Sequence, residues 1–388
     1  MLFCDFCSFP GANFSLFILS CSYFFVNLHL FMENGCKSAV ITAEDKKYIS
    51  RCLQLARNGS GSTSPNPMVG AVIVCDGKII GEGYHIRCGE PHAEVNAVRS
   101  VRDASLLNRS TIYVSLEPCS HYGKTPPCAD LIINSGIPRV VIATTDNNSM
   151  VSGRGIERMR AAGIDVLVGV CEEEAYALNS AFFTYHGKNR PLVTLKWAQS
   201  SDGYIDAARQ GGEALKISNA ASMMAVHKLR ATHDAILVGR RTAQMDNPSL
   251  TLRHWAGRTP LRLVIDREGI LPASLRVFSP EAPTVVYTQN ISQGKFPKNV
   301  SQVALDFSQD IIPQILAHLH EKKIGSLLVE GGSRLLQSFI DAGLWDEIRI
   351  ETNPALSLGS GVPAPQLPQG LKKEKYHCFG NVIECIKG

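Results

Sequence analysis

Two short runs decide the fold of this 388-residue chain: Gly89-Glu90-Pro91-His92-Ala93-Glu94-Val95, and Glu117-Pro118-Cys119 with Cys128 downstream. One imidazole and two thiolates can hold a zinc ion that keeps its fourth position for water, and zinc lowers the pKa of that water to about 7. A carboxylate beside the metal can then shuttle protons. We therefore expect His92, Cys119 and Cys128 to bind Zn²⁺ and Glu94 to be the catalytic acid and base.

Both ligand runs are predicted to open helices. Pro91 precedes His92, and Pro126 and Pro127 precede Cys128, which is the position that proline favours at a helix start. In a first turn the helix dipole helps to keep a thiolate negative. A purely structural zinc site in a non-catalytic binding protein is the alternative, and it would leave Glu94 without a role.

Predicted helices and strands alternate along the chain around these two runs. Asp76-Gly77 between two apolar runs is a strong hairpin signal. Apolar spacing predicts helices at about 44–57, 92–100, 153–162 and 172–185, a further helix from Pro126, and strands at 69–75, 78–83, 111–115, 139–143 and 165–168. This order indicates an α/β layered fold with a mixed sheet and the metal at the ends of its strands.

A second α/β unit follows the short polar segment 186–191, where we place a domain boundary. Its clearest strands are expected at 192–198, 234–238, 261–265, 284–287 and 326–329, with helices ending at 230 and spanning 310–320 and 333–342. No Gly-x-Gly-x-x-Gly follows a strand, which argues against a Rossmann domain. Instead, Val329-Glu330-Gly331-Gly332-Ser333 joins a strand to a helix, where free amides can cradle a phosphate.

Composition agrees with two enzymatic domains. The chain is 45% hydrophobic and 19% charged, which can supply two cores, and its net charge is only +4. Without a basic block or an aromatic stripe, a nucleic acid is not expected as a partner, and we expect a small-molecule substrate instead. Twelve cysteines scattered through a long chain fit a reducing cytoplasm better than a disulfide framework. Whether the chain forms a homo-oligomer is left open.

The first forty residues are expected to belong to neither domain. The apolar run 14–26 has the character of a signal peptide or an anchor, but no Lys or Arg precedes it. We therefore expect translation to start at Met32 and the protein not to associate with membranes. A genuine anchor is the alternative.

The spacing of the two cysteines is the most specific feature of the chain. Cys119 and Cys128 are far apart, as in the riboflavin-pathway pyrimidine deaminases, whereas most cytidine and tRNA-adenosine deaminases have Cys-x-x-Cys. The runs 65–70 and 81–85 also match this group, and the likeness continues from about Ala43 through most of the chain. The sequence thus resembles the family of bifunctional riboflavin biosynthesis proteins, in which a diaminohydroxyphosphoribosylaminopyrimidine deaminase is fused to a 5-amino-6-(5-phosphoribosylamino)uracil reductase.

The resemblance implies an architecture and two cofactors. A cytidine-deaminase-like three-layer domain with a mixed sheet, at 41–186, would precede a dihydrofolate-reductase-like α/β domain at 191–388. The cofactors would be Zn²⁺ and NADPH, and the enzyme would be both a hydrolase and an NADP-dependent oxidoreductase. A monofunctional pyrimidine deaminase with an inert reductase-like half is the alternative.

The resemblance also implies roles for individual residues. The deaminase substrate contacts would be Asn66, His85, His121 and Lys124. The cofactor contacts in the reductase would be Ala198, Thr242, Gly331 and Gly332, and its substrate contacts Arg230, Asp246, Leu250, Arg253 and Glu330. The chain departs from the family pattern at Asp146-Asn147-Asn148-Ser149 and at Lys216, where an aromatic side chain is usual. We therefore expect the loop that begins at Asp146 to be less rigid than in the family and the stacking next to the nicotinamide to differ.

Overall fold

The computed structural model describes residues 40–122, 126–146, 153–209 and 215–388. The expectations for the segment before residue 40, for Lys124 and for the loop after Asp146 therefore concern residues outside this description. Ala43–Gly388 forms one compact unit. In the part of the chain that is described, no helix combines the length and apolar character needed to span a bilayer.

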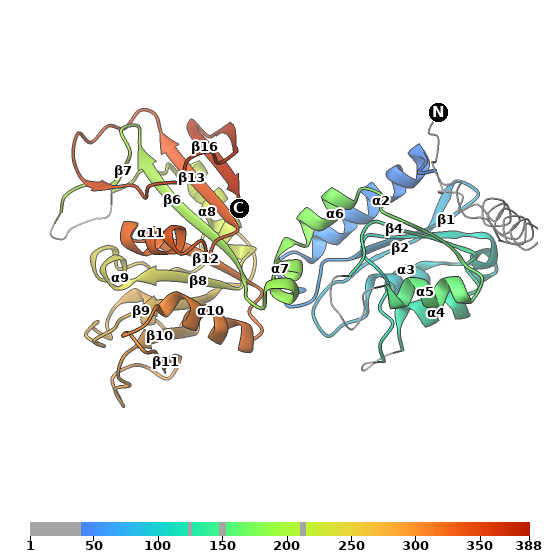
Figure 1. Ribbon diagram of the computed structural model, residues 1–388, viewed down its shortest axis with the longest axis horizontal. Helices are drawn as coiled ribbons and strands as arrows, with labels where there is room; N and C mark the ends of the chain where they lie inside the picture. Colours follow the sequence, from blue (N-terminus) through green and yellow to red (C-terminus); the bar gives the residue numbers. More distant parts are fainter. Residues whose placement is uncertain (1–39, 123–125, 147–152, 210–214) are drawn as a thin grey trace, which may run out of the picture. The chain divides into compact units, whose positions relative to one another are not determined.

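A mixed five-stranded sheet organises the first half, with the strand order β2-β1-β3-β4-β5 (Figure 1). Strand β1 (Gly70–Cys75) pairs antiparallel with β2 (Lys78–Tyr84) and β3 (Thr111–Val114), and β4 (Arg139–Ile142) and β5 (Asp165–Val168) continue the sheet in parallel. The predicted hairpin is confirmed, since Asp76 and Gly77 have φ values of 48° and 72°, as a tight primed turn requires. The mixed sheet is confirmed as well.

Helices cover both faces of this sheet and make three layers. Helices α2 (Ala43–Ala56) and α6 (Glu172–Leu178) share a core with Val72 and Val74 of β1. Helices α3 (Ala93–Ser100), α4 (Cys128–Asn134) and α5 (Arg154–Ala161) pack on the other face, with Ala71 and Ile73. Alternate residues of β1 thus point to opposite layers, because successive side chains of a strand do so. Two 3₁₀ turns, Arg57–Gly59 and Ala104–Arg109, complete this half.

One predicted element of the first half is wrong. The helix expected over 172–185 is two helices, α6 and α7 (Ser180–Lys188), separated at Asn179. The Asn179 side chain accepts a hydrogen bond from the backbone N–H of Met68 (2.8 Å) and donates one to its carbonyl (2.9 Å). A tertiary contact therefore competes with the helix at this position, and apolar spacing cannot reveal it.

The second half contains a nine-stranded sheet with the order β11-β10-β9-β8-β12-β6-β13-β16-β15. The strands are β6 (Leu192–Ser200), β8 (Ala235–Gly239), β9 (Leu261–Ile265), β10 (Thr284–Thr288), β11 (Val300–Ala304), β12 (Ser326–Gly331), β13 (Glu347–Asn353), β15 (Lys373–Cys378) and β16 (Asn381–Lys387). The first seven strands of this order, from β11 through β13, pair in parallel. The last two strands, β16 and β15, form an antiparallel edge. The sequence analysis predicted β6, β8, β9, β10 and β12 but missed β11, β13 and this C-terminal edge.

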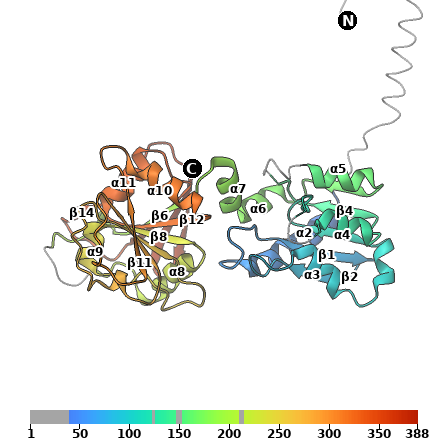
Figure 2. The same cartoon turned by 90° about the horizontal axis from the view of Figure 1, so that it is seen from below.

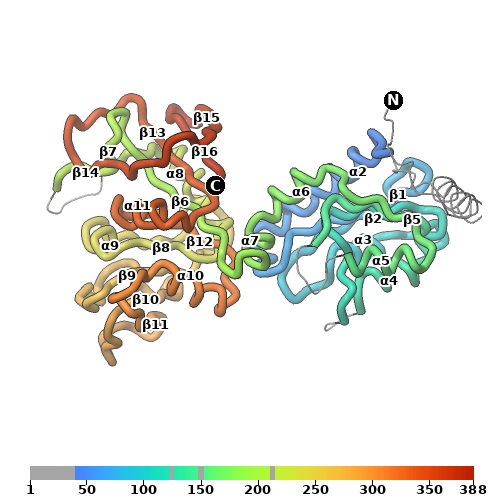
Figure 3. Tube along the Cα trace, in the orientation of Figure 1, coloured from blue at the N-terminus to red at the C-terminus, as the bar shows by residue number. Residues whose placement is uncertain are grey.

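Two cores hold the helices of the second half against its sheet. Helices α10 (Ile311–Glu321) and α11 (Ser333–Asp341) cover one face, and α8 (Ala220–Ala231) and α9 (Arg240–Asp246) contribute to the other (Figure 2). The 3₁₀ turn Arg276–Phe278 adds Val277 and Phe278 to one of these cores. The strands β7 (Tyr204–Asp206) and β14 (Val362–Pro363) form a separate two-stranded sheet. Figure 3 traces each half as a contiguous stretch of chain. The predicted succession of two α/β folds is confirmed.

Candidate active sites

Three side chains of the first half converge as a metal site. The ligand atoms of His92, Cys119 and Cys128 all lie within 4.8 Å of one another. His92 Nδ1 is 3.6 Å from Cys119 Sγ and 3.4 Å from Cys128 Sγ. A tetrahedral zinc ion with the usual Zn–S and Zn–N bond lengths would separate sulfur and nitrogen by about 3.5 Å. The spacing therefore fits zinc held by three protein ligands.

Local structure explains how these ligands come together. His92 caps the N-terminus of α3, and Cys128 is the first residue of α4, so two helix starts face each other as predicted. Cys119 lies beyond the end of β3, and its sulfur accepts a hydrogen bond from the backbone N–H of Cys128 (3.3 Å). Hydrogen bonding from Cys128 lowers the pKa of the Cys119 thiol. A lowered pKa favours the thiolate, which is the form that binds metals.

Glu94 stands beside these ligands on the first turn of α3. The side chain is buried, and it forms a hydrogen bond with the Cys128 thiol. Burial raises the pKa of Glu94 to about 7, and the charge of Cys119 acts in the same direction. A carboxyl group with a pKa near neutrality can both accept and donate a proton at the pH of a cell. Burial beside three ligand atoms distinguishes Glu94 from a carboxylate on a helix surface.

Of the four predicted substrate contacts of the deaminase half, two lie next to each other near the metal ligands. Asn66 Nδ2 and His85 Nε2 are 3.2 Å apart, and the His85 ring packs edge-on against His92 with 5.4 Å between centroids. Burial lowers the pKa of His85, so its imidazole is neutral near pH 7. His121 is exposed on the loop after Cys119, and Lys124 lies among the residues that are not described.

Glu117 is a site residue that the sequence analysis did not assign. Its buried carboxylate accepts hydrogen bonds from the backbone N–H groups of Asp146 (3.3 Å), Gly153 (3.0 Å) and Gly155 (3.1 Å). It therefore ties both ends of the 146–153 loop to the segment that carries Cys119. The run Glu117-Pro118-Cys119 was noticed for its cysteine, and nothing in one sequence shows which amides a carboxylate will reach.

The predicted cofactor contacts of the second half lie at the carboxyl ends of neighbouring strands. Ala198 is near the end of β6 and Gly331 ends β12, which pairs with both β6 and β8. A Cβ on Gly331 would lie 2.8 Å from Thr242 Cγ2, and one on Gly332 would lie 3.3 Å from Thr242 Oγ1. The two glycines and Thr242 thus form a close-packed cradle at the start of α11. Ligands of open parallel sheets bind at such an edge.

The predicted reductase substrate contacts form a second cluster, built around an ion pair. Arg230 of α8 donates to Glu330 through Nε (2.9 Å) and Nη2 (2.6 Å). Glu330 is the extra residue of a bulge in β12, a device that redirects a side chain. Burial opposes its ionisation, but the charge and hydrogen bonds of Arg230 keep the pKa of Glu330 below its usual value.

The loop after α9 supplies the remaining predicted contacts. Asp246 receives a hydrogen bond from Arg209, and Arg253 donates to the Ser249 hydroxyl. Leu250 is buried with a φ of 54°, so this loop has an unusual backbone. Burial and then the charge of Arg230 lower the pKa of Arg253. Arg230 itself already binds Glu330.

Two groups at the reductase site were missed from the sequence. Lys196 on β6 is buried, 3.9 Å from Glu351, and burial lowers its pKa. His227 of α8 accepts a hydrogen bond from the Arg253 backbone N–H, and its buried Nε2 has no hydrogen-bond partner among the described residues. Burial lowers the pKa of His227 to about 4. A lysine inside a strand and a histidine inside a helix have no local signature. Lys216, which stands where the family usually has an aromatic residue, is exposed.

Comparison with known families agrees with this geometry. Residues 42–144 match the cytidine and deoxycytidylate deaminase zinc-binding region, and residues 191–381 match the RibD C-terminal domain. The riboflavin biosynthesis protein RibD of Aquifex aeolicus is 44% identical over 346 residues, which cover 87% of this chain and 96% of that protein. RibD of Escherichia coli is 38% identical, with coverage of 85% and 93%.

Solved structures extend the comparison to three dimensions. The diaminohydroxyphosphoribosylaminopyrimidine deaminase/5-amino-6-(5-phosphoribosylamino)uracil reductase of Thermotoga maritima superposes with a TM-score of 0.81 at 38% identity, covering 89% of this chain and 98% of that one. One form of Acinetobacter baumannii RibD has a TM-score of 0.80 at 32% identity and the same coverage. Because these relatives span both halves, the chain belongs to the RibD family of bifunctional riboflavin biosynthesis enzymes, with a zinc-dependent deaminase half and an NADPH-dependent reductase half.

Proposed function

We propose that the chain catalyses two consecutive steps on one pyrimidine. Water would replace an exocyclic amine of 2,5-diamino-6-(5-phosphoribosylamino)pyrimidin-4(3H)-one with loss of ammonia. NADPH would then reduce the ribosyl group to a ribityl chain, giving 5-amino-6-(5-phosphoribitylamino)uracil. The observation that carries this proposal is the buried Glu94 beside three converging ligand atoms. The name of the Thermotoga maritima relative supports the substrate class.

In the deaminase step, Glu94 would move the proton. His92, Cys119 and Cys128 would hold zinc, which activates water for attack at neutral pH. Glu94 would take a proton from the attacking water and deliver it to the departing amine. Its raised pKa suits both transfers, because a group that titrates near the working pH gives and accepts protons with similar ease.

Asn66, His85, His121 and Lys124 would bind the deaminase substrate. Asn66 and His85 are within hydrogen-bonding distance of each other, so each can fix the orientation of the other. The neutral imidazole of His85 can donate to or accept from a pyrimidine edge without a charge. Lys124 would supply a point charge for the phosphate.

In the reductase step, the strand ends of the second half would bind NADPH. Ala198, Thr242, Gly331 and Gly332 would contact the cofactor, which supplies a hydride. Arg230, Asp246, Leu250, Arg253 and Glu330 would hold and orient the sugar phosphate. Arg253 would contribute a fork of donors for phosphate oxygens, while Glu330 holds Arg230 in place.

We further propose domain limits and a cellular setting. The deaminase domain would span 41–186 and the reductase domain 191–388, with residues 1–40 in neither. Helix α7 ends at Lys188, inside the polar segment that separates them. The twelve cysteines, scattered through a long chain and including two proposed zinc ligands, support a reducing cytoplasm. The partners would be the pyrimidine phosphate and its cofactor, and self-association would be tested by measuring mass in solution.

Product mass tests the whole proposal. Purified protein would be incubated with the diaminopyrimidine ribose phosphate, first without and then with NADPH. We expect the first product to have exchanged one amine for oxygen and the second to have gained two hydrogens as well. An unchanged substrate mass with zinc-loaded protein would contradict the deaminase assignment, and a first product that NADPH leaves unaltered would contradict the reductase assignment.

A further inference from the structure

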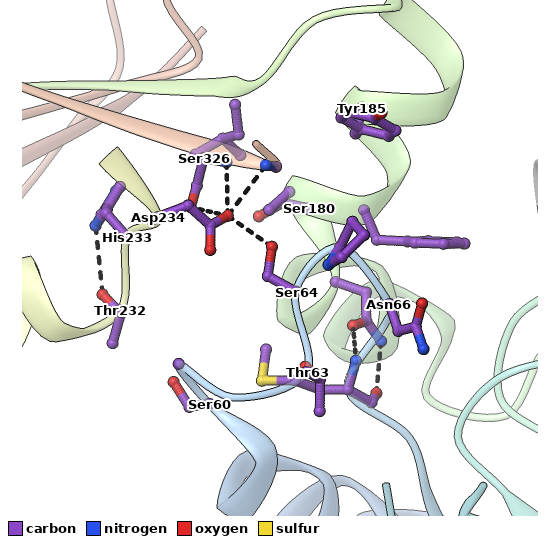
Figure 4. Close-up of a pocket in the computed structure, with 18 of the residues that line it drawn as sticks. Ser60, Thr63, Ser64, Asn66, Ser180, Tyr185, Thr232, His233, Asp234 and Ser326 are labelled. Atoms are coloured by element: carbon purple, nitrogen blue, oxygen red, sulfur yellow. Dashed lines mark hydrogen bonds between the residues drawn. The ribbon is translucent and has the colours of Figure 1, made fainter. Parts of the chain in front are cut away.

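The segment that carries Asn66 is attached to the reductase half. The Ser64 hydroxyl donates a hydrogen bond of 2.6 Å to Oδ2 of Asp234, the residue before β8 (Figure 4). Both residues line a cavity of about 190 Å³. Hydroxyl-to-carboxylate bonds of this length are charge-assisted and stronger than neutral ones. A reductase carboxylate thus fixes a position two residues from a proposed substrate contact of the deaminase.

Asp234 is itself a rigid support. Its carboxylate is buried, and Oδ2 also accepts from the backbone N–H of Gly325 (3.0 Å) and of Ser326 (3.1 Å). The Asp234 N–H donates to the Ser326 hydroxyl (3.0 Å), and Arg258 binds Oδ1 (2.7 Å). These bonds tie the carboxylate to the starts of β8 and β12. Its position cannot shift without disturbing two central strands.

Close backbone packing reinforces the contact. A Cβ on Gly61 would lie 2.7 Å from the carbonyl oxygen of Ala231, at the end of α8. A Cβ on Gly325 would lie 3.1 Å from the Ser64 hydroxyl oxygen. Glycine at both positions lets the segment and the reductase backbone approach more closely than other residues allow. The same segment is held from the deaminase side by Asn179, which bonds both backbone groups of Met68.

From Ser64 a short path of contacts leads to the metal ligands. Asn66 lies 3.2 Å from His85 through their side-chain nitrogens. The other ring nitrogen of His85 is 3.2 Å from the carbonyl oxygen of Pro91, and its ring faces that of His92 edge-on. A displacement of Ser64 would therefore first change the positions of Asn66 and His85, because these residues lie between Ser64 and the zinc site.

We propose that Ser64 and Asp234 are positioning residues for the deaminase, through which the reductase half holds the deaminase substrate segment in place. This inference rests on the proposed role of Asn66 in binding substrate. Neither residue needs to touch the pyrimidine. The reductase half would then serve the deamination directly, by holding the deaminase substrate segment, in addition to catalysing the second reaction.

Steady-state deamination by the full-length, zinc-loaded protein tests this proposal. Deleting the hydroxyl in Ser64→Ala should raise KM for the pyrimidine phosphate by about threefold to tenfold, as loss of one charge-assisted hydrogen bond implies, with kcat within about twofold. Zinc content and reductase activity should remain those of the wild type. Ser64→Thr, which keeps the hydroxyl, should restore KM. Ser60→Ala deletes an exposed hydroxyl of the same turn and is the matched control.

A second pair of variants separates this proposal from the role of Asn66. Asp234→Asn keeps the shape but removes the charge that strengthens the bond from Ser64. Its effect on KM and that of Ser64→Ala should not be additive, because both changes act on the same contact between Ser64 and Asp234. Asn66→Ala should raise KM further. An effect of Asn66→Ala with no effect of Ser64→Ala would overturn the inference and leave the role of Asn66 standing. No effect of Asn66→Ala would overturn both. Loss of zinc or of reductase activity in Ser64→Ala would show general support of the fold and also overturn the inference.

Discussion

The deaminase and reductase sites of this chain are built in opposite ways. His92, Glu94, Cys119 and Cys128 come from two helix starts and one adjoining loop, and a metal ion would complete their arrangement. The reductase cradle instead depends on the ends of separate strands, with Gly331 packed against Thr242 of another element. A metal site is therefore concentrated in a few side chains, whereas a strand-end site depends on how a whole sheet packs.

The strongest test of this difference is the substitution Glu94→Gln. Loss of proton transfer should reduce deaminase kcat by about 10² to 10⁴, the usual contribution of general acid–base catalysis. Zinc should remain bound, because the three ligand atoms are unchanged. Ammonia release and metal content measure the two properties on one sample. Glu82→Gln alters a carboxylate paired with Arg51 at the surface and serves as the control.

Reductase activity of the Glu94→Gln protein sharpens the test. It should equal that of the wild type when the deaminated pyrimidine is supplied directly, since the change is confined to the first half. Ammonia release at the wild-type rate would refute the catalytic role of Glu94 and favour a structural metal. A parallel fall in reductase activity would instead indicate a defect in folding.

The next largest effect is expected from Arg230→Ala, and it falls on stability as well as on catalysis. The change leaves Glu330 buried without its partner, and breaking a buried pair in this way costs about 3–5 kcal/mol. Denaturant unfolding should show the loss. Combining Arg230→Ala with Glu330→Gln should recover part of it, because the uncompensated charge is gone. If the Arg230→Ala protein is as stable as the wild type, the pair of Arg230 and Glu330 contributes little to the free energy of unfolding.

The sign of the pH dependence follows from the same pair. The pKa of Glu330 is lowered in the folded protein, so its ionised form stabilises the fold above the pKa of the unfolded chain. This contribution is lost as the pH falls through the folded-state pKa. The stability difference between the wild type and the double variant should therefore shrink in acid.

The contrast between the sites also explains what the sequence could and could not predict. The cluster of His92, Cys119 and Cys128 beside Glu94 could be predicted because zinc chemistry demands particular residue types at short spacing. The strands β6, β8, β9, β10 and β12 could be predicted because their apolar runs are long. Asn179 and Asp234 were missed, since each acts on a segment remote in sequence, Met68 and Ser64 respectively. Lys196 was missed because a charged residue in an apolar strand gives no sign of its partners. The antiparallel edge β15–β16 was missed because its strands are largely polar and partly exposed.

The smallest expected effect concerns the cofactor cradle and is seen in Gly331→Ala. The new Cβ would lie 2.8 Å from Thr242 Cγ2, so the end of β12 or the start of α9 must shift. Overpacking of this kind costs about 1–3 kcal/mol, and here it should appear as a KM for NADPH raised by about tenfold. Deaminase activity, measured on the same protein, should be unchanged. Adding Thr242→Ala removes the clashing methyl group and should not worsen binding further, even though Thr242 is itself a proposed contact. A Gly331→Ala protein with the wild-type KM for NADPH would place the cofactor away from these strand ends, and the proposed division between a metal-centred site and a sheet-edge site would then need another location for the hydride donor.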